Sequence, residues 1–308
     1  MIPLLLAAVG AGLSTLLLDR SAGGAAPEGK ALPEGKGPSP AQVPPVASSP
    51  DAARVVVLPK PGKPETAARI RDLAGNFDKV WTDVTKQPAP MPPPAKLIAL
   101  AQAAAEQSGF GAFLNGNVGS YQCPLKKGQP AQSTAYYDCV EHEDSSPDAR
   151  GGGNVTYKVP FRQYKDGTTP DGKSRTAKEA GAWDFLTSIT VKPFPALPEL
   201  LAGDLLGYAR KQYGQHYYEG FNLSPEGMTA YAPTISKLIA GGVPVRKAGE
   251  TPETVAGRIA FYAAAMARSL PELTAALGYD SAPVNVPADL LIPWKPSYQA
   301  RPAPKAIA

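Results

Sequence analysis

Residues 95–109 read AKLIALAQAAAEQSG, and this run constrains the fold more than any other stretch of the chain. The run follows Pro94 and reaches Gly109, which are ordinary start and stop signals for a helix. Because almost every position is Ala, Leu or Ile, the predicted helix over 95–108 is apolar on all sides. A helix of this kind is usually buried all round. We therefore expect other elements to surround it.

Proline sets the limits of the folded part. The chain has 35 prolines among 308 residues, and many lie near its two ends. Residues 21–64 are mostly Pro, Gly, Ala, Ser and Lys, which predicts an extended, semi-stiff tether. Its one apolar run, 54–58, could form at most a short strand between prolines. Residues 65–279 are the predicted domain, and 280–308 the predicted Pro-rich tail.

The predicted domain is α+β and mostly helical. Apolar residues at spacings of three and four predict the first helix, and Pro and Gly positions delimit the others. Two runs in a Gly-rich polar region have the composition of strands. The predicted helices are 65–86, 95–108, 175–189, 198–213, 225–240 and 251–277, and the predicted strands are 133–140 and 155–164.

Glu106 is the main candidate for chemistry. It lies in the last turn of the apolar helix, on the same face as Gln102. The negative end of the helix dipole and burial both raise the pKa of a carboxyl group there. A carboxylic acid that stays protonated near neutral pH is what a glycosidase needs to protonate a leaving group. The alternative is an exposed Glu at a fraying helix end.

The stretch 103–122, AAAEQSGFGAFLNGNVGSYQ, resembles the signature of glycoside hydrolase family 73, the glucosaminidases, and of lysozyme-like enzymes. In that family an Ala/Leu-rich helix ends in the catalytic Glu, followed by Ser/Thr-Gly-aromatic-Gly and Asn-apolar-Gly. Glu106 with 108–111 matches the first part, and 117–119 matches the second. The resemblance implies a lysozyme-like fold with a small β-lobe, and Glu106 as catalytic acid.

The resemblance extends over residues 94–277. FRQY at 161–164 matches the aromatic-Arg-x-Tyr that closes the family's β-lobe, and the helix at 176–186 follows in family order. Three features depart from the pattern. Phe110 stands where Trp is usual, the loop after Asn117 is enlarged, and HYYEGF at 216–221 matches only loosely. The second catalytic position is therefore open.

The function implied is hydrolysis of the β-1,4 bond between N-acetylated amino sugars in peptidoglycan. Glu141, or else Glu143 or Asp144, would be the facing β-lobe carboxylate; the alternative is a solvated acidic turn. The substrate's own N-acetyl group could replace that carboxylate. If no second group acts, Glu106 alone would serve as acid and then base, as in a lytic transglycosylase.

A sugar cleft needs aromatic faces and polar groups. Arg162 would orient a carboxylate or an acetamido oxygen, or form a structural salt bridge, and Asn117 would bind sugar or hold its loop. The aromatic candidates, each of which could instead be an ordinary core residue, are Tyr121, Tyr136, Tyr137, Phe161, Tyr164, Tyr217 and Tyr218.

Two rival functions stay open. A lysozyme-like domain that has lost turnover would be a wall-binding or structural protein of a membrane or virion. A membrane-anchored assembly protein without a glycan ligand would explain the Pro-rich ends.

The remaining groups restrict the chemistry. Cys123 and Cys139 flank a polar loop, which predicts a disulfide in an exported protein and two free thiols in a reducing compartment. With only His142 and His216, no zinc site is expected, nor is any cofactor. The net charge of +4 has no dense basic run, so nucleic acid is not an expected partner. The excess would suit an anionic wall polymer or simply solubility.

The localisation follows from the function together with the first residues. Residues 2–18 carry no charge and would make a helix of about 25 Å, which predicts that 1–20 is a signal sequence or a membrane anchor. The basic residues that follow, Arg20, Lys30 and Lys36, would by themselves hold that flank in the cytoplasm. We expect an exported or anchored protein facing the cell envelope, or one associated with a virion.

Overall fold

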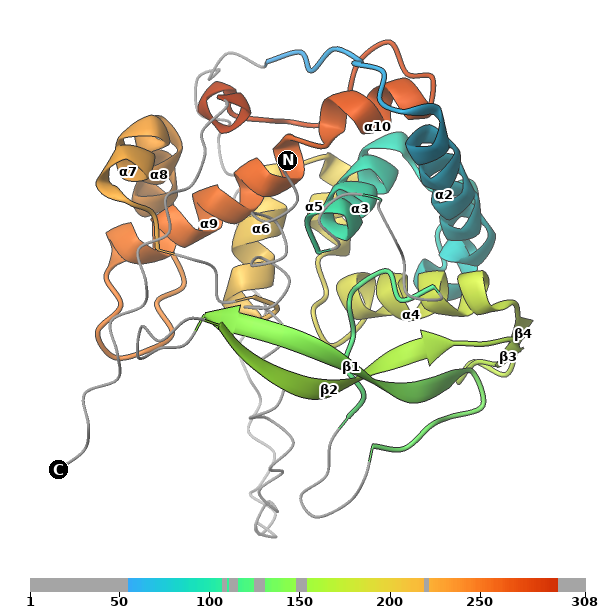
Figure 1. The fold of residues 1–308 in the computed structure, drawn as a ribbon. Coiled ribbons are helices and arrows are strands. Elements are labelled where there is room, and N and C mark those ends of the chain that lie inside the picture. Colours follow the sequence, from blue (N-terminus) through green and yellow to red (C-terminus); the bar gives the residue numbers. More distant parts are fainter. Residues whose placement is uncertain are drawn as a thin grey trace, which may run out of the picture.

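A computed structural model of the chain describes residues 55–106, 110, 116–124, 131–147, 154–218 and 222–292. These residues form an α+β fold that is mostly helical, as predicted. The helices make one body, and a long β-hairpin lies along one side of it (Figure 1). The helices are α2 (Pro64–Thr85), α3 (Pro93–Glu106), α4 (Ala177–Thr190), α5 (Leu197–Ala202), α6 (Leu205–Gly214), α7 (Pro225–Ala230), α8 (Ala232–Ala240), α9 (Pro252–Ala267) and α10 (Leu270–Ala276), with a 3-10 turn, η2 (Ala288–Leu291).

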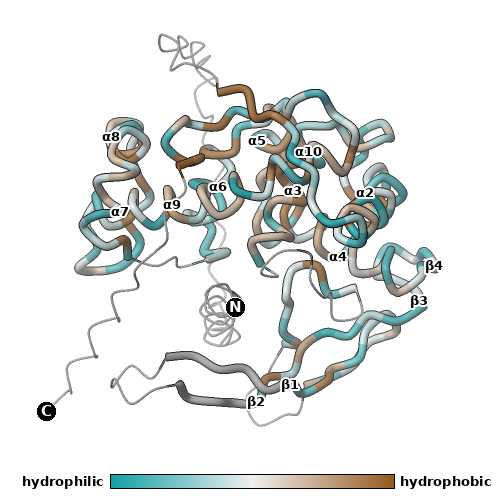
Figure 2. Tube along the Cα trace, turned by 45° about the horizontal axis from the view of Figure 1, so that its top comes forward, coloured by the Kyte–Doolittle hydropathy of each residue, from teal (hydrophilic) through white to brown (hydrophobic). Residues whose placement is uncertain are grey.

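Helix α3 is buried on all sides, as its composition predicts. Every residue from Ala95 to Glu106 is buried. Helices α2, α5, α9 and α10 pack against it, and its largely apolar trace lies inside the helical body in Figure 2. Its one cation, Lys96, is neutralised by Asp78 at 2.7 Å. Apart from Gln102 and Glu106, the other residues from Ala95 on contribute apolar surface to the core, which burial removes from water.

Helices α2 and α4 form a second packed pair. The buried face of α2 repeats at helical spacing through Ile70, Leu73, Phe77 and Val80. The ring of Phe77 stacks on Phe185 of α4 with centroids 5.7 Å apart. Helix α4 starts at a capping box, in which Thr176 and Glu179 satisfy each other's backbone N–H groups.

Three predicted helices are each divided in two. The 198–213 helix breaks at Gly203, whose φ of 65° ends α5, and the carboxylate of Asp204 then caps α6 through Gly207 N at 2.9 Å. The 225–240 helix divides at Tyr231 and the 251–277 helix divides after Ala267. Both later pieces have a proline in their first turn, the helical position where a missing N–H costs nothing.

The β-lobe is an antiparallel hairpin. Strand β1 (Tyr137–Pro147) pairs with β2 (Asn154–Tyr164), with Tyr137 opposite Tyr164. Strand β1 starts later than the predicted 133–140 and runs further. Gln122 bridges to Phe161, which joins the segment after α3 to β2. A second, short hairpin leads into α4. Its strands, β3 (Gly167–Thr168) and β4 (Ser174–Arg175), have two residues each.

The packed unit is wider than the predicted 65–279. Val57 is buried, and its carbonyl accepts a 3.0 Å hydrogen bond from Ala282 N. Val284, Val286 and Leu290 are also buried. Residues 280–292, predicted as tail, therefore belong to the domain, while 55–58 form no strand. The predicted signal or anchor 1–20, the linker up to residue 54 and the tail from 293 lie outside the described residues.

No helix within the described ranges is both long and apolar enough to cross a bilayer.

Candidate active site

The Glu106 carboxyl group is buried at the end of α3, with 5% of the residue exposed. The hydroxyl of Tyr262 donates a 2.7 Å hydrogen bond to its Oε1 atom. Burial raises the pKa of Glu106 from 4.5 to about 7, although hydrogen bonding from Tyr262 and Tyr217 acts in the opposite direction. The alternative of a solvent-exposed Glu at a fraying helix end is wrong, because the side chain is enclosed.

Two other elements bring the tyrosines to this carboxyl group. Tyr262 lies in the middle of α9, which packs on both α3 and α6. Tyr217 follows α6 directly after His216, whose φ of 64° turns the chain back toward the core. The next residue, Tyr218, stacks on the ring of Tyr262 with centroids 3.9 Å apart. The site therefore depends on α3, α6 and α9 packing together.

A second polar side chain of α3 lies one turn before Glu106. Gln102 is completely buried, and its Oε1 atom accepts a hydrogen bond from the hydroxyl of Tyr208 on α6. Gln102 and Glu106 were predicted to share one helix face, and Tyr217 and Tyr218 were among the predicted substrate-binding residues. Tyr208 and Tyr262 were not predicted, because nothing in their local sequence distinguishes them from ordinary core tyrosines.

Asn117 holds a turn beside the site. Its side chain accepts a hydrogen bond from Tyr121 N at 2.7 Å and donates one to Tyr121 O at 2.9 Å. Ser120 Oγ donates to the backbone oxygen of Glu106 at 3.3 Å. Of the two roles open for Asn117, these contacts support the structural one.

Arg162 forms the salt bridge that was its alternative role. Its guanidinium group pairs with Asp184 of α4, and the hydroxyl of Tyr164 donates to the same carboxylate. The guanidinium carbon lies 5.4 Å from the ring centre of Tyr121 and 5.0 Å from that of Tyr137. The bonds to Asp184 attach the base of the hairpin to α4, and the ring contacts hold the guanidinium group in place.

Most of the candidate aromatic residues pack among themselves. Tyr136 meets Tyr137, Tyr164 and Trp183 with ring centres 4.9 to 6.2 Å apart. Phe161 is buried on β2 opposite Val140. Of the seven candidates, Tyr217 is the one whose hydroxyl lowers the pKa of the Glu106 carboxyl group.

Glu141, the first choice for a second carboxylate, is exposed on β1 opposite Pro160. None of the contacts described for the chain joins it to Glu106. The side chains of Glu143 and Asp144 lie outside the described part. A second acid facing Glu106 thus stays a prediction.

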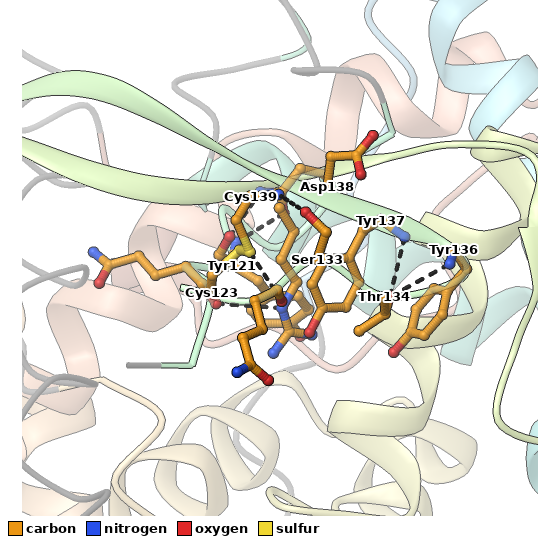
Figure 3. Close-up of a disulfide and its surroundings, with 12 residues drawn as sticks. Tyr121, Cys123, Ser133, Thr134, Tyr136, Tyr137, Asp138 and Cys139 are labelled. Atoms are coloured by element: carbon orange, nitrogen blue, oxygen red, sulfur yellow. Dashed lines mark hydrogen bonds between the residues drawn. A yellow bond between two sulfur atoms is a disulfide. The ribbon is translucent and has the colours of Figure 1, made fainter. Parts of the chain in front are cut away.

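The predicted disulfide joins Cys123 and Cys139. It ties the segment after Asn117 to β1, next to the hydrogen bond from Cys139 N to Ser133 Oγ at 3.0 Å (Figure 3). Within the described ranges, no three His, Cys, Asp or Glu side chains gather closely enough to hold a metal ion.

A surface hollow of about 770 Å³ lies elsewhere, between α5, α6 and the loop at 242–244. Its lining includes Glu199, Arg210 and Lys211 but neither Glu106 nor the tyrosines around it.

No family model matches this chain, and neither a curated protein nor a solved structure does so. The likeness to glucosaminidases therefore rests on the motif residues alone.

Proposed function

We propose that the protein is a peptidoglycan hydrolase with a lysozyme-like domain, which cleaves β-1,4 bonds between N-acetylated amino sugars with Glu106 as general acid. The observation that carries the proposal is the enclosed carboxyl group, whose pKa of about 7 keeps much of it protonated near neutral pH. A buried acid is costly to keep unless it has a use or full pairing. Its place at the end of the central helix agrees with the motif resemblance.

In the proposed reaction, protonated Glu106 gives its proton to the glycosidic oxygen as the bond to the sugar carbon breaks. The leaving sugar departs as an alcohol, and positive charge develops on the ring of the other sugar. The hydroxyl of Tyr262, already 2.7 Å from Oε1, then stabilises the carboxylate that remains. Water completes the hydrolysis by adding to the charged ring carbon, and the proton that it loses returns to the Glu106 carboxylate, directly or through the second group.

The second group in the proposal is Glu141, which would activate that water or steady the charged ring. Its exposed position on β1 leaves it accessible to substrate. Two other routes need no protein carboxylate: assistance by the substrate's N-acetyl group, or intramolecular attack as in a lytic transglycosylase, with Glu106 as acid and then base.

The disulfide supports a location outside the reducing cytoplasm. In the proposal, residues 1–20 act as signal or anchor, and the Pro-rich linker lets the domain reach glycan strands from a membrane or from a virion.

One observation favours the second candidate, a catalytically inactive wall-binding or structural protein. Glu106 is 95% covered, so substrate reaches it only if the neighbouring chain moves. An inactive domain needs no such opening.

The test compares the full chain with Glu106→Gln on purified peptidoglycan, and mass spectrometry identifies the released ends. Reducing GlcNAc, reducing MurNAc and anhydro ends each name a different activity. The exposed Glu65 gives a matched control, Glu65→Gln. We expect release from the wild type and the control but not from Glu106→Gln. Release by Glu106→Gln would remove Glu106 from the role, and binding without any release would select the inactive candidate.

A further inference from the structure

The hollow between α5, α6 and the loop at 242–244 has a volume of about 770 Å³, which is within the range of small-molecule sites. Helices α5 and α6 pack against each other beside it (Figure 1). Two residues of its lining, Gly207 and Gly214, are helical glycines seven positions apart, so they share one face of α6. Because neither has a side chain, this face leaves room for a ligand.

The start of this face is acidic. Glu199 of α5 and Asp204, the residue that caps α6, both line the hollow. They lie close together, because Asp204 N donates a 3.1 Å hydrogen bond to Glu199 O. The Oε2 atom of Glu199 is buried, and the described part of the chain gives it no hydrogen-bond partner. A carboxylate partly removed from water without a donor or a cation is costly, so this end favours a cationic group.

The same face becomes basic further along α6. Arg210 and Lys211 both line the hollow. The Nη2 atom of Arg210 donates to Gly241 O at 2.9 Å, which places the guanidinium group beside the loop at 242–244. Lys211 is exposed, and it follows Asp204 by seven positions, or about 10 Å along the helix. The hollow therefore has a negative end and a positive end about 10 Å apart.

Opposite charges at that distance select the length of a ligand as well as its charge. The ammonium and carboxylate groups of a free amino acid are attached to one carbon atom, whereas three residues of extended peptide span about 10 Å. We propose that the hollow binds a short peptide of about three residues with both ends free. Its ammonium group lies at Glu199 and Asp204, and its carboxylate lies at Arg210 and Lys211. The inference goes beyond the proposed function and does not depend on it, since Glu106 is not among the residues that line the hollow.

The probe is the tripeptide Ala-Ala-Ala, titrated into the full chain and followed by the backbone amide signals of Gly207 and Gly242 in nitrogen-15 NMR spectra. Two capped peptides separate its ends: the N-acetylated form has no ammonium group, and the C-terminal amide has no carboxylate. We expect the free tripeptide to shift both signals and each capped form to bind more weakly. Glu199→Gln should weaken binding of the free tripeptide roughly tenfold, because a charge-assisted hydrogen bond is lost. Lys211→Gln should weaken it roughly threefold, because this side chain is exposed.

Each variant should act on one end of the peptide only. Glu199→Gln should leave binding of the N-acetylated form unchanged, and Lys211→Gln should leave binding of the amide unchanged. The exposed Lys237 on α8, outside the hollow, gives the control Lys237→Gln, which should change nothing. The inference is overturned if the free tripeptide shifts neither signal, if the capped forms bind as tightly, or if Glu199→Gln weakens the N-acetylated form equally. The capped peptides need no variant, so they decide the question even if a variant does not fold.

Discussion

The hydroxyl of Tyr262 donates a 2.7 Å hydrogen bond to Oε1 of Glu106, across 156 positions of sequence. The bond connects the middle of α9 to the last residue of α3 inside the core. The ring of Tyr262 is itself held by stacking on Tyr218. The acid is therefore held by tertiary packing and not by its local sequence.

Replacing Tyr262 by Phe should raise the pKa of Glu106 further above about 7, because the carboxylate loses a donor while burial stays. Unfolding by urea should show a loss of about 1 kcal/mol, the usual worth of one hydrogen bond. Tyr279→Phe, at a partly exposed ring, is the control and should change neither quantity. An unchanged pKa in Tyr262→Phe would contradict the described bond.

The stability of the protein should depend on pH through Glu106. Its pKa is about 7 in the folded chain and near the ordinary 4.5 when unfolded. Below 4.5 the group is neutral in both states, so its contribution is fully present. As pH rises through about 7, the unfolded chain is already charged while the folded one must charge a buried group, and the contribution is lost.

Glu106→Gln should therefore gain stability relative to wild type between pH 4.5 and pH 7. The gain should reach at most about 3.5 kcal/mol, at roughly 1.4 kcal/mol per pKa unit. Urea titrations of both proteins across this range measure it. A difference between them that does not vary with pH would show that Glu106 keeps an ordinary pKa.

Wall cleavage, if the proposed function holds, should decrease on the alkaline side with a midpoint near 7. Glu106 must carry a proton to act as acid, so the rate should fall roughly tenfold per pH unit above that point. Clearing of purified sacculi measured from pH 5 to 9 gives the profile. A rate that stays level up to pH 9 would exclude Glu106 as the acid.

Two helical glycines should respond in opposite ways to alanine. A Cβ atom on Gly181 of α4 would lie 1.9 Å from the backbone oxygen of Gly116, whereas one on Gly75 of α2 would meet nothing within 4 Å. Gly75→Ala should stabilise the protein by about 0.5–1 kcal/mol through helix propensity. Gly181→Ala should destabilise the protein, because the backbone at Gly116 or in α4 must move to make room for the new Cβ atom. Thermal denaturation compares them, and equal effects would contradict the close approach of α4 to Gly116.

Composition was sufficient to predict the surroundings of α3. Its residues are nearly all Ala, Leu and Ile, and the helix is buried all round, with Glu106 enclosed as expected. The disulfide also followed from two cysteines around one polar loop. These features depend on local composition, which a single sequence displays.

Partners distant in sequence were not predictable. Tyr208 reaches Gln102 across 106 positions, and its position within α6 reads as ordinary core spacing. Asp184, the salt-bridge partner of Arg162, lies on a different element, so this pairing could not be predicted from the local sequence either. The divided helices are different, because Gly203, Asp204 and the prolines at 233 and 271 were visible in the sequence. The breaks were not predicted because the apolar periodicity continues across them.

The hydrogen bond between Ala282 and Val57 brings together two stretches near the opposite ends of the packed unit. The chain thus enters the domain beside residue 282, and it then continues through η2, where Asp289 accepts a 2.7 Å hydrogen bond from Thr234 of α8. A circular permutant with new termini in a distant surface loop therefore needs a linker that starts after η2 and returns to the segment at Val57.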